Sequence, residues 1–106
     1  MEKCGVTNTV ISKHGIPIRL TIERWEHIVT QHTELVQFRQ EVLDTVAEPE
    51  QILAGGNEEK LAVREITSGK WLVVVYRETL DDGFIVTAFW TRRHRALAKR
   101  EILWSR

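Results

Sequence analysis

Several features that often reveal a protein's function are scarce in this chain of 106 residues. It has a single cysteine, Cys4, which cannot form an internal disulfide and agrees with a reducing compartment. Its longest apolar run, residues 71–76, suits one buried strand and is far shorter than the ~20 residues of a membrane-spanning helix. The start of the chain lacks the apolar core of a secretory signal. We therefore expect a cytoplasmic protein that does not enter a membrane.

Motifs for nucleotide binding, serine nucleophiles and zinc are also missing. Gly55 and Gly56 lack the flanking residues of a phosphate-binding loop, and no Gly-x-Ser-x-Gly pattern occurs. His27 and His32 miss the i, i+4 spacing of a helical zinc pair, and the sequence has no cysteine cluster or third ligand near them. We therefore expect neither a metal site nor any other cofactor.

The formal net charge is zero because two unequal parts cancel. Residues 1–90 contain nine Lys or Arg and fourteen Asp or Glu, a charge of −5, whereas residues 91–106 contain six Lys or Arg and one Glu, a charge of +5. The cations that could contact phosphates are Arg92, Arg93, Arg95, Lys99 and Arg100, with His94 among them. The plain alternative is a solvated loop and short helix whose arginines pair with the acidic remainder of the chain.

The first half of the chain predicts a β-hairpin or arm followed by two helices. Residues 6–20 favour extended structure, and His14-Gly15 stands in their middle like the turn of a hairpin. Thr21 then has the position of a helix N-cap. Apolar residues recur at the helical period in two stretches before Pro49, namely residues 22–32 and 35–46.

The second half predicts an antiparallel sheet, because short β-rich segments alternate with turn residues. The expected strands are residues 51–53, 61–67, 71–78, 83–91 and 101–104. We therefore predict one α+β domain over residues 1–106, in which the helices cover one sheet face and leave the other free for function. Its expected parts are an N-terminal arm (1–20), two helices (21–48) and a four- to five-stranded antiparallel sheet (50–104).

Four polar side chains are candidates for chemistry. On a helical wheel His32 falls among apolar residues and His27 lies nearly opposite, so the two imidazoles cannot share one face. Arg64 interrupts an apolar strand and needs a partner or a solvent-exposed face, and Thr87 lies within another strand. The structural alternatives are a hydrogen-bonded histidine in the core or at a helix end for His32, a surface residue for His27 and an ordinary strand residue for Thr87.

Histidine, arginine and threonine beside a basic segment are side chains that metal-free RNA cleavage can use. In that reaction the ribose 2′-hydroxyl attacks its own phosphate, one group accepts a proton and another donates one to the leaving oxygen. Cations stabilise the charge of the phosphorane. The reaction needs no cofactor.

The order of several short motifs resembles that of a known family. These motifs are Arg24-Trp25-x-His27-Ile28, His32 with Glu34-Leu35, Pro49-x-x-Ile52, Thr87-Ala88-Phe89 and Glu101-Ile102-Leu103-Trp104. Over about residues 20–104 the chain resembles the small phage- and bacteria-encoded proteins of the barnase–EndoU–colicin–RelE-like nuclease superfamily. It departs from them at Thr33, where proline commonly follows the second histidine, and in the unusually arginine-rich segment before Glu101.

The resemblance implies helices followed by a four-stranded antiparallel sheet, and activity as a metal-independent ribonuclease that is a toxin or a phage-associated effector. Carried over by position, it implies that His27 or His32 is the general acid or base. It further implies that Arg64 stabilises phosphate charge and that Thr87 orients the phosphate or the 2′-hydroxyl. The expected RNA contacts are Arg77, Arg92, Arg93, Arg95, Lys99 and Arg100.

The expected partners are RNA, free or on the ribosome, and an antitoxin-like protein. Two other functions remain open. One is a non-catalytic RNA-binding module that uses the basic C-terminal segment. The other is a protein-interaction domain, with Trp71, Trp90 and Trp104 available for a partner surface.

Overall fold

The computed structural model describes residues 8–106, apart from the side chain of His94. Cys4 and the first residues of the predicted arm lie outside the described residues. The helices, in chain order, are α1 (Ile22–Gln31), the 3-10 turn η1 (Thr33–Leu35), α2 (Arg39–Ala47) and α3 (His94–Ala98). The strands are β1 (Asn8–Ile11), β2 (Pro17–Leu20), β3 (Gln51–Ala54), β4 (Lys60–Thr67), β5 (Lys70–Glu78), β6 (Gly83–Thr91) and β7 (Ile102–Ser105).

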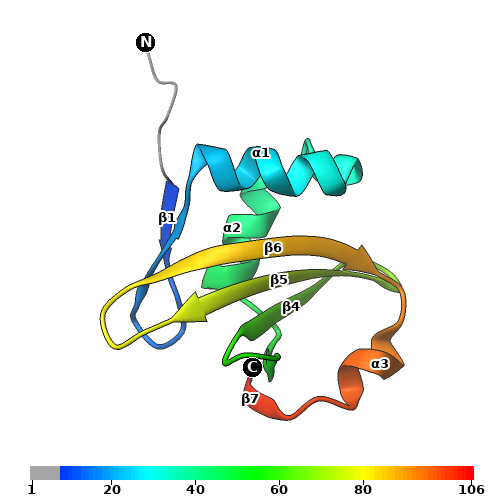
Figure 1. The fold of residues 1–106 in the computed structure, drawn as a ribbon. Helices are drawn as coiled ribbons and strands as arrows, with labels where there is room; N and C mark the ends of the chain where they lie inside the picture. The colour runs from blue at the N-terminus through cyan, green and yellow to red at the C-terminus, as the bar shows by residue number, and fades with distance from the viewer. Residues whose placement is uncertain (1–7) are drawn as a thin grey trace.

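Within the described residues, the seven strands form one sheet in the order β1-β2-β6-β5-β4-β3-β7 (Figure 1). The α+β class is confirmed, but the prediction of four or five purely antiparallel strands is wrong. The hairpin of β1 and β2 joins the sheet, and β2 pairs with β6 in parallel, with Ile18 opposite Gly83. This pairing buries Ile18 and Leu20, whose apolar side chains a separate hairpin would leave in water.

Gly83 permits this parallel contact. A Cβ atom at this position would collide with the carbonyl oxygen of Arg77 and with the side chain of Ile18. The close packing of β6 against both β5 and β2 at this point therefore depends on a residue without a side chain. No local pattern in the sequence predicts this contact, because the contact joins segments that are far apart in the chain.

Helices α1 and α2 cover one face of the sheet, which we call the helix face (Figure 1). The side-chain oxygen of Thr21 accepts a hydrogen bond from the Arg24 backbone and caps α1 as predicted. The second predicted helix is divided into η1 and α2, and Phe38 stands at the start of α2 without a side-chain cap. The core of this face includes Ile28, Leu35, Val42, Val46, Leu72 and Val74.

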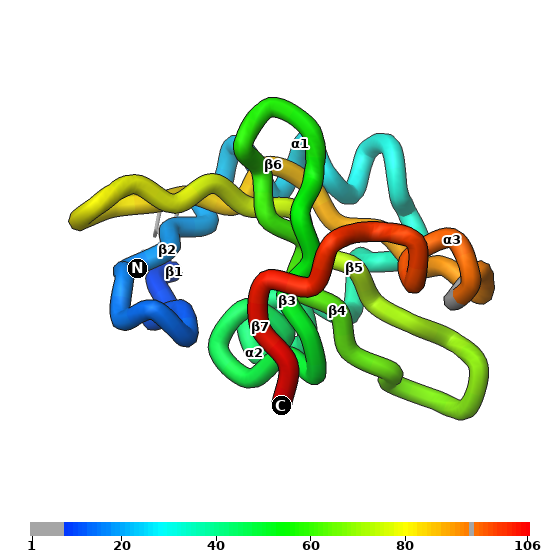
Figure 2. The backbone as a smooth tube through the Cα atoms, turned by 90° about the horizontal axis from the view of Figure 1, so that it is seen from below, coloured from blue at the N-terminus to red at the C-terminus, as the bar shows by residue number. Residues whose placement is uncertain are grey.

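The other sheet face, which we call the open face, has its own apolar cluster. Leu97 of α3 packs there against strand residues that include Leu53, Leu61, Val63, Val73 and Val75. Figure 2 shows α3 and β7 near the part of the sheet that contains β3, β4 and β5. The expectation of a free second face therefore holds only in part, because α3 covers a portion of it.

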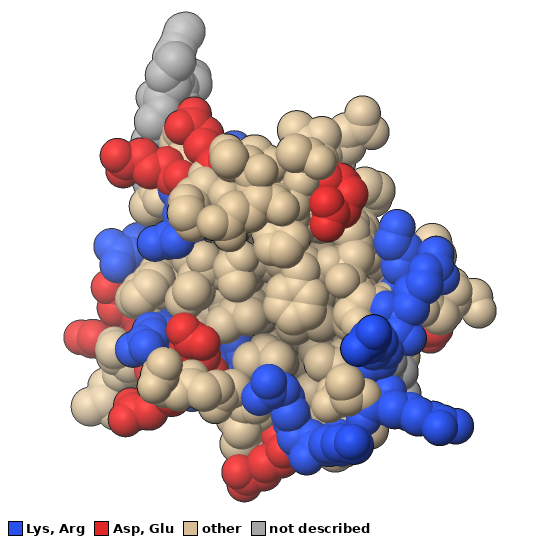
Figure 3. Space-filling model, turned by 45° about the vertical axis from the view of Figure 1, so that its right-hand side comes forward, with Lys and Arg blue, Asp and Glu red and all other residues tan. Residues whose placement is uncertain are grey.

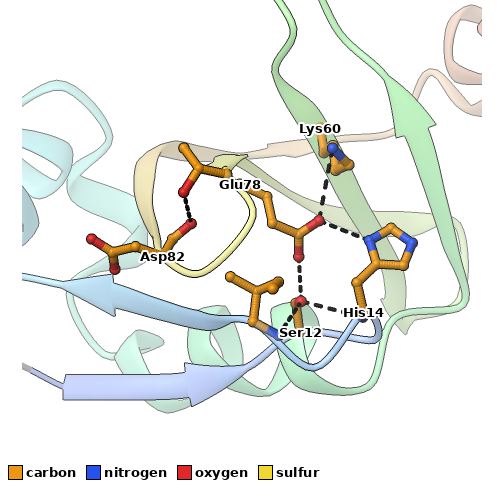
Figure 4. Close-up of polar contacts among 7 residues, drawn as sticks. Ser12, His14, Lys60, Glu78 and Asp82 are labelled. Atoms are coloured by element: carbon orange, nitrogen blue, oxygen red, sulfur yellow. Dashed lines mark hydrogen bonds and ion pairs between the residues drawn. The ribbon is translucent and has the colours of Figure 1, made fainter.

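Polar contacts around Glu78 attach the turn between β1 and β2 to the rest of the sheet (Figure 4). The Glu78 carboxylate accepts a hydrogen bond from Ser12 Oγ. It also lies 2.7 Å from Nδ1 of His14 and 3.7 Å from Nζ of Lys60. We call these four residues the Glu78 network. The Glu78 side chain is only 5% exposed, so these neighbours, and not water, stabilise its negative charge.

No helix within residues 8–106 has the length and apolar character needed to cross a membrane.

Candidate functional site

The basic segment begins where β6 ends. The backbone N–H of Arg93 donates a 3.0 Å hydrogen bond to Oγ1 of Thr91, and α3 follows directly. Leu97 is buried against the open face and thereby anchors α3 to the sheet. This segment lines a cleft of about 570 Å³, which we call the basic cleft. Its lining residues are Arg92, Arg93, Arg95, Ala96 and Lys99.

The four cations of the basic cleft are exposed to solvent. Among the described side chains, none of them forms an ion pair with a carboxylate. Arg100 next to them donates a hydrogen bond of 3.1 Å to the carbonyl oxygen of Ala54. Figure 3 shows Lys and Arg gathered at the margin of a face whose centre is largely uncharged. The alternative that the arginines pair with the acidic remainder of the chain is therefore not observed for the cleft residues.

His32 lies at the C-terminal end of α1, close to β6. Its side chain is 32% exposed, its Nδ1 is 3.7 Å from Oε2 of Glu34, and its ring centroid is 6.3 Å from that of Phe89. Nε2 of His32 has no partner among the described residues. The imidazole thus has a carboxylate near Nδ1, and its Nε2 is available to a ligand.

Thr87 belongs to the open face. It lies opposite Val75 in the register of β5 and β6, and Phe89 lies opposite Val73. Because side chains alternate along a strand, Thr87, Phe89 and Thr91 share this face. They form a line that ends at the basic cleft, and His32 stands beside its middle member.

Arg64 lies on the opposite side of the sheet from Thr87. In the register of β4 and β5 it is opposite Leu72, a residue of the helix-face core. Its neighbours two positions away, Ala62 and Ile66, pack against the same core. The structure therefore does not bring Arg64 and Thr87 together.

His27 and Arg77 also lie away from the basic cleft. His27 is exposed and lines a separate groove of about 330 Å³ with Thr21, Glu23 and Arg24. Arg77 has its Nε 3.8 Å from Oε2 of Glu59 and is opposite Phe84 at the start of β6. Phe84 is seven residues from Thr91, or roughly 23 Å along a strand at ~3.3 Å per residue.

Two neighbours of the candidate site, Phe89 and Glu34, are not among the residues that the sequence singles out for chemistry. Phe89 follows Thr87 by two positions, so strand alternation could have placed it on the same face. The contact of His32 with Phe89 had no such signal, because it depends on how α1 lies along β6. The side chain of His94 is outside the described residues.

Within the described part of the chain, no group of three or more His, Cys, Asp or Glu side chains is arranged to hold a metal ion. The expected absence of a cofactor stays a prediction. No known protein family, no curated protein and no solved structure matches this chain. A function therefore has to be argued from the geometry and chemistry of the site.

Proposed function

We propose that the protein is a metal-independent RNA endonuclease whose substrate crosses the open face along β6 and reaches the basic cleft. One juxtaposition supports this proposal: the exposed cations of the basic cleft directly follow a strand face that carries Thr87 and Phe89, with His32 beside Phe89. Cations suit phosphates, and an imidazole with a free nitrogen suits proton transfer. The resemblance to the barnase–EndoU–colicin–RelE-like nuclease superfamily agrees with this function.

In the proposed reaction the 2′-oxygen forms a bond to phosphorus and the bond from phosphorus to the 5′-oxygen breaks. A base takes the proton of the 2′-hydroxyl, and an acid gives a proton to the departing 5′-oxygen. The products are a 2′,3′-cyclic phosphate and a 5′-hydroxyl. We assign one of the two proton transfers to His32, whose Nε2 is available, while Glu34 beside Nδ1 orients the ring.

Thr87 and the basic cleft supply the remaining functions in this proposal. The Thr87 hydroxyl, which has no partner among the described residues, orients a phosphate oxygen or the 2′-hydroxyl. The cations of the basic cleft stabilise the negative charge of the phosphate backbone. Arg64 is given no part in the chemistry, because it lies on the helix face.

The direct test is incubation of a labelled RNA with the purified protein in excess EDTA, for the wild type, His32→Ala and His27→Ala. We expect the wild type to cleave and His32→Ala to lose about 10²- to 10⁴-fold in rate, as is typical when a general acid or base is removed. His27→Ala is the matched control on the same helix, and its rate should stay near that of the wild type. Equal cleavage by all three proteins would rule out the histidine mechanism.

A non-catalytic RNA-binding module is the second candidate, and the unpaired cations of the basic cleft favour it as much as they favour an enzyme. It predicts salt-dependent binding without cleavage by the folded wild type, with or without EDTA. The toxin or phage-effector role extends the enzyme proposal. Expression of the wild type should then arrest bacterial growth, while expression of His32→Ala should not.

A further inference from the structure

Two adjoining grooves lie at the other end of β6 from the basic cleft. One, of about 260 Å³, is lined by Arg19, Thr21, Arg24, Phe84 and Ile85. The other, of about 330 Å³, is lined by Thr21, Glu23, Arg24 and His27. Because they share Thr21 and Arg24, they form a continuous surface, which we call the Phe84 groove.

Phe84 is the distinctive side chain of this surface. It is 41% exposed, although an aromatic ring in a strand usually lies in the core. It lies opposite Arg77, and a bulge at the next register positions inserts Val86 into β6. Phe84 therefore lies on the open face together with Thr87 and Phe89.

The charges of the Phe84 groove are close to balance. NH2 of Arg19 lies 2.9 Å from Oδ2 of Asp82, so its charge is compensated. Arg24 has no ion pair among the described residues, and Glu23 lines the same groove. An exposed aromatic ring in nearly neutral surroundings suits a nucleobase better than a phosphate, because every base has a flat face that can stack on it.

We infer that the Phe84 groove is a nucleobase subsite, in which one base of a single-stranded RNA stacks on Phe84 while the phosphates farther along the strand lie in the basic cleft. Arg24, which lines both grooves, then contacts the edge or the sugar-phosphate of that nucleotide. This inference rests on the proposed RNA function. The two sites lie at opposite ends of β6, so the RNA must span roughly 23 Å, at ~3.3 Å per strand residue, to occupy both.

Fluorescence anisotropy with a labelled 2′-O-methyl RNA oligonucleotide tests this inference, because that RNA binds without being cut by 2′ attack. We expect Phe84→Ala to weaken binding roughly tenfold, in line with the loss of one stacked base, and Phe84→Tyr to restore it. Leu80→Ala is the matched control, since Leu80 is 97% exposed in the turn that precedes β6. Its affinity should equal that of the wild type.

A base-deletion scan adds a readout that damage to the fold would not reproduce. An abasic nucleotide is placed at successive positions of the oligonucleotide. At one position the abasic nucleotide should lower the RNA affinity of the wild type by the same factor of roughly ten. The affinity of Phe84→Ala should not fall further at that position, because the stacking partner of the base is already gone. The salt dependence of binding should be unchanged in Phe84→Ala, because no phosphate contact is removed.

The outcomes separate the subsite from the proposed function. If the wild type binds the RNA and Phe84→Ala binds it equally well, the subsite is refuted and the RNA function stands. If Phe84→Ala is weaker but the abasic scan affects both proteins alike at every position, stacking on Phe84 is refuted. If the wild type binds no RNA at all, the proposed function fails and the subsite with it.

Discussion

The two ends of the β5–β6 hairpin carry charge in opposite ways. At one end, beside Gly83, the Glu78 carboxylate is 5% exposed and is held by Ser12, His14 and Lys60. At the other end, beyond Thr91, the cations of the basic cleft are exposed and have no ion-pair partner among the described residues. Both clusters are polar, but only the second has charge left for a ligand.

On the proposed function, the first cluster serves the fold and the second binds a ligand. A buried carboxylate must be paired, and its partners here tie the hairpin of β1 and β2 to the sheet. Like charges without ion-pair partners among the described residues repel one another, which agrees with the polyanionic partner proposed above. The first cluster should therefore affect stability alone, and the second should affect RNA binding alone.

The largest effect is expected from reversing the charge of the basic cleft. The triple variant of Arg92, Arg93 and Arg95 to Glu should weaken binding of a 2′-O-methyl RNA by about a hundredfold or more and should flatten its salt dependence. Its melting temperature should change little, because no ion pair is lost. Anisotropy at several salt concentrations and thermal unfolding measure the two properties. Unchanged RNA affinity would contradict the assignment of this cleft.

The next effect concerns the opposite end of the hairpin. Glu78→Ala should lower the free energy of unfolding by roughly 3 kcal/mol, because it removes the acceptor shared by Ser12, His14 and Lys60. Urea unfolding measures the change. Glu48→Ala is the control, since Glu48 forms an exposed pair with Lys13 and should cost less than about 1 kcal/mol. A loss of RNA affinity in Glu78→Ala, with the fold intact, would contradict the claim that the Glu78 network affects stability alone.

The smallest effect concerns Tyr76, which is fully buried next to the Glu78 network and whose hydroxyl has no hydrogen-bond partner among the described residues. Tyr76→Phe should raise the free energy of unfolding by up to about 1 kcal/mol near neutral pH, because an unsatisfied polar group is removed. Urea unfolding at neutral pH tests this increase.

Tyr76 also predicts a pH dependence. Burial, and secondarily the charge of Glu78, raise the pKa of Tyr76 well above its ordinary range. The unfolded chain releases the phenol proton above about pH 10, whereas the folded chain retains it, so this group makes stability fall as the pH rises further. Unfolding at increasing alkaline pH should show this loss in the wild type, and Tyr76→Phe should lack that part of it. An identical decline in both proteins would refute it.

Local structure was largely readable from the sequence, whereas the sheet edge and the site were not. The apolar periods predicted α1 and the strands around β5 and β6 because burial imposes those periods on the sequence. The parallel pairing of β2 with β6 depends on Gly83 and Ile18, which are far apart in the chain. No local pattern carries that information.

The sequence identified candidate residues for chemistry, but it could not predict which of them lie close together in the fold. Arg64 and Thr87 both interrupt apolar strands, yet the register of β4, β5 and β6 assigns them to opposite faces. The basic segment was evident from composition, but whether its arginines were paired with carboxylates depended on the folded arrangement. The proximity of His32 to Phe89 likewise follows from the position of α1 along β6.

The most direct test of this division between the Glu78 network and the basic cleft is a nuclear magnetic resonance titration. The isotopically labelled protein is titrated with a 2′-O-methyl RNA oligonucleotide. We expect shifted backbone resonances at His32, at Phe84, at residues 87–93 and along α3, with those of Ser12, His14 and Glu78 unaffected. Shifts centred on the Glu78 network, or none anywhere at saturating RNA, would contradict it.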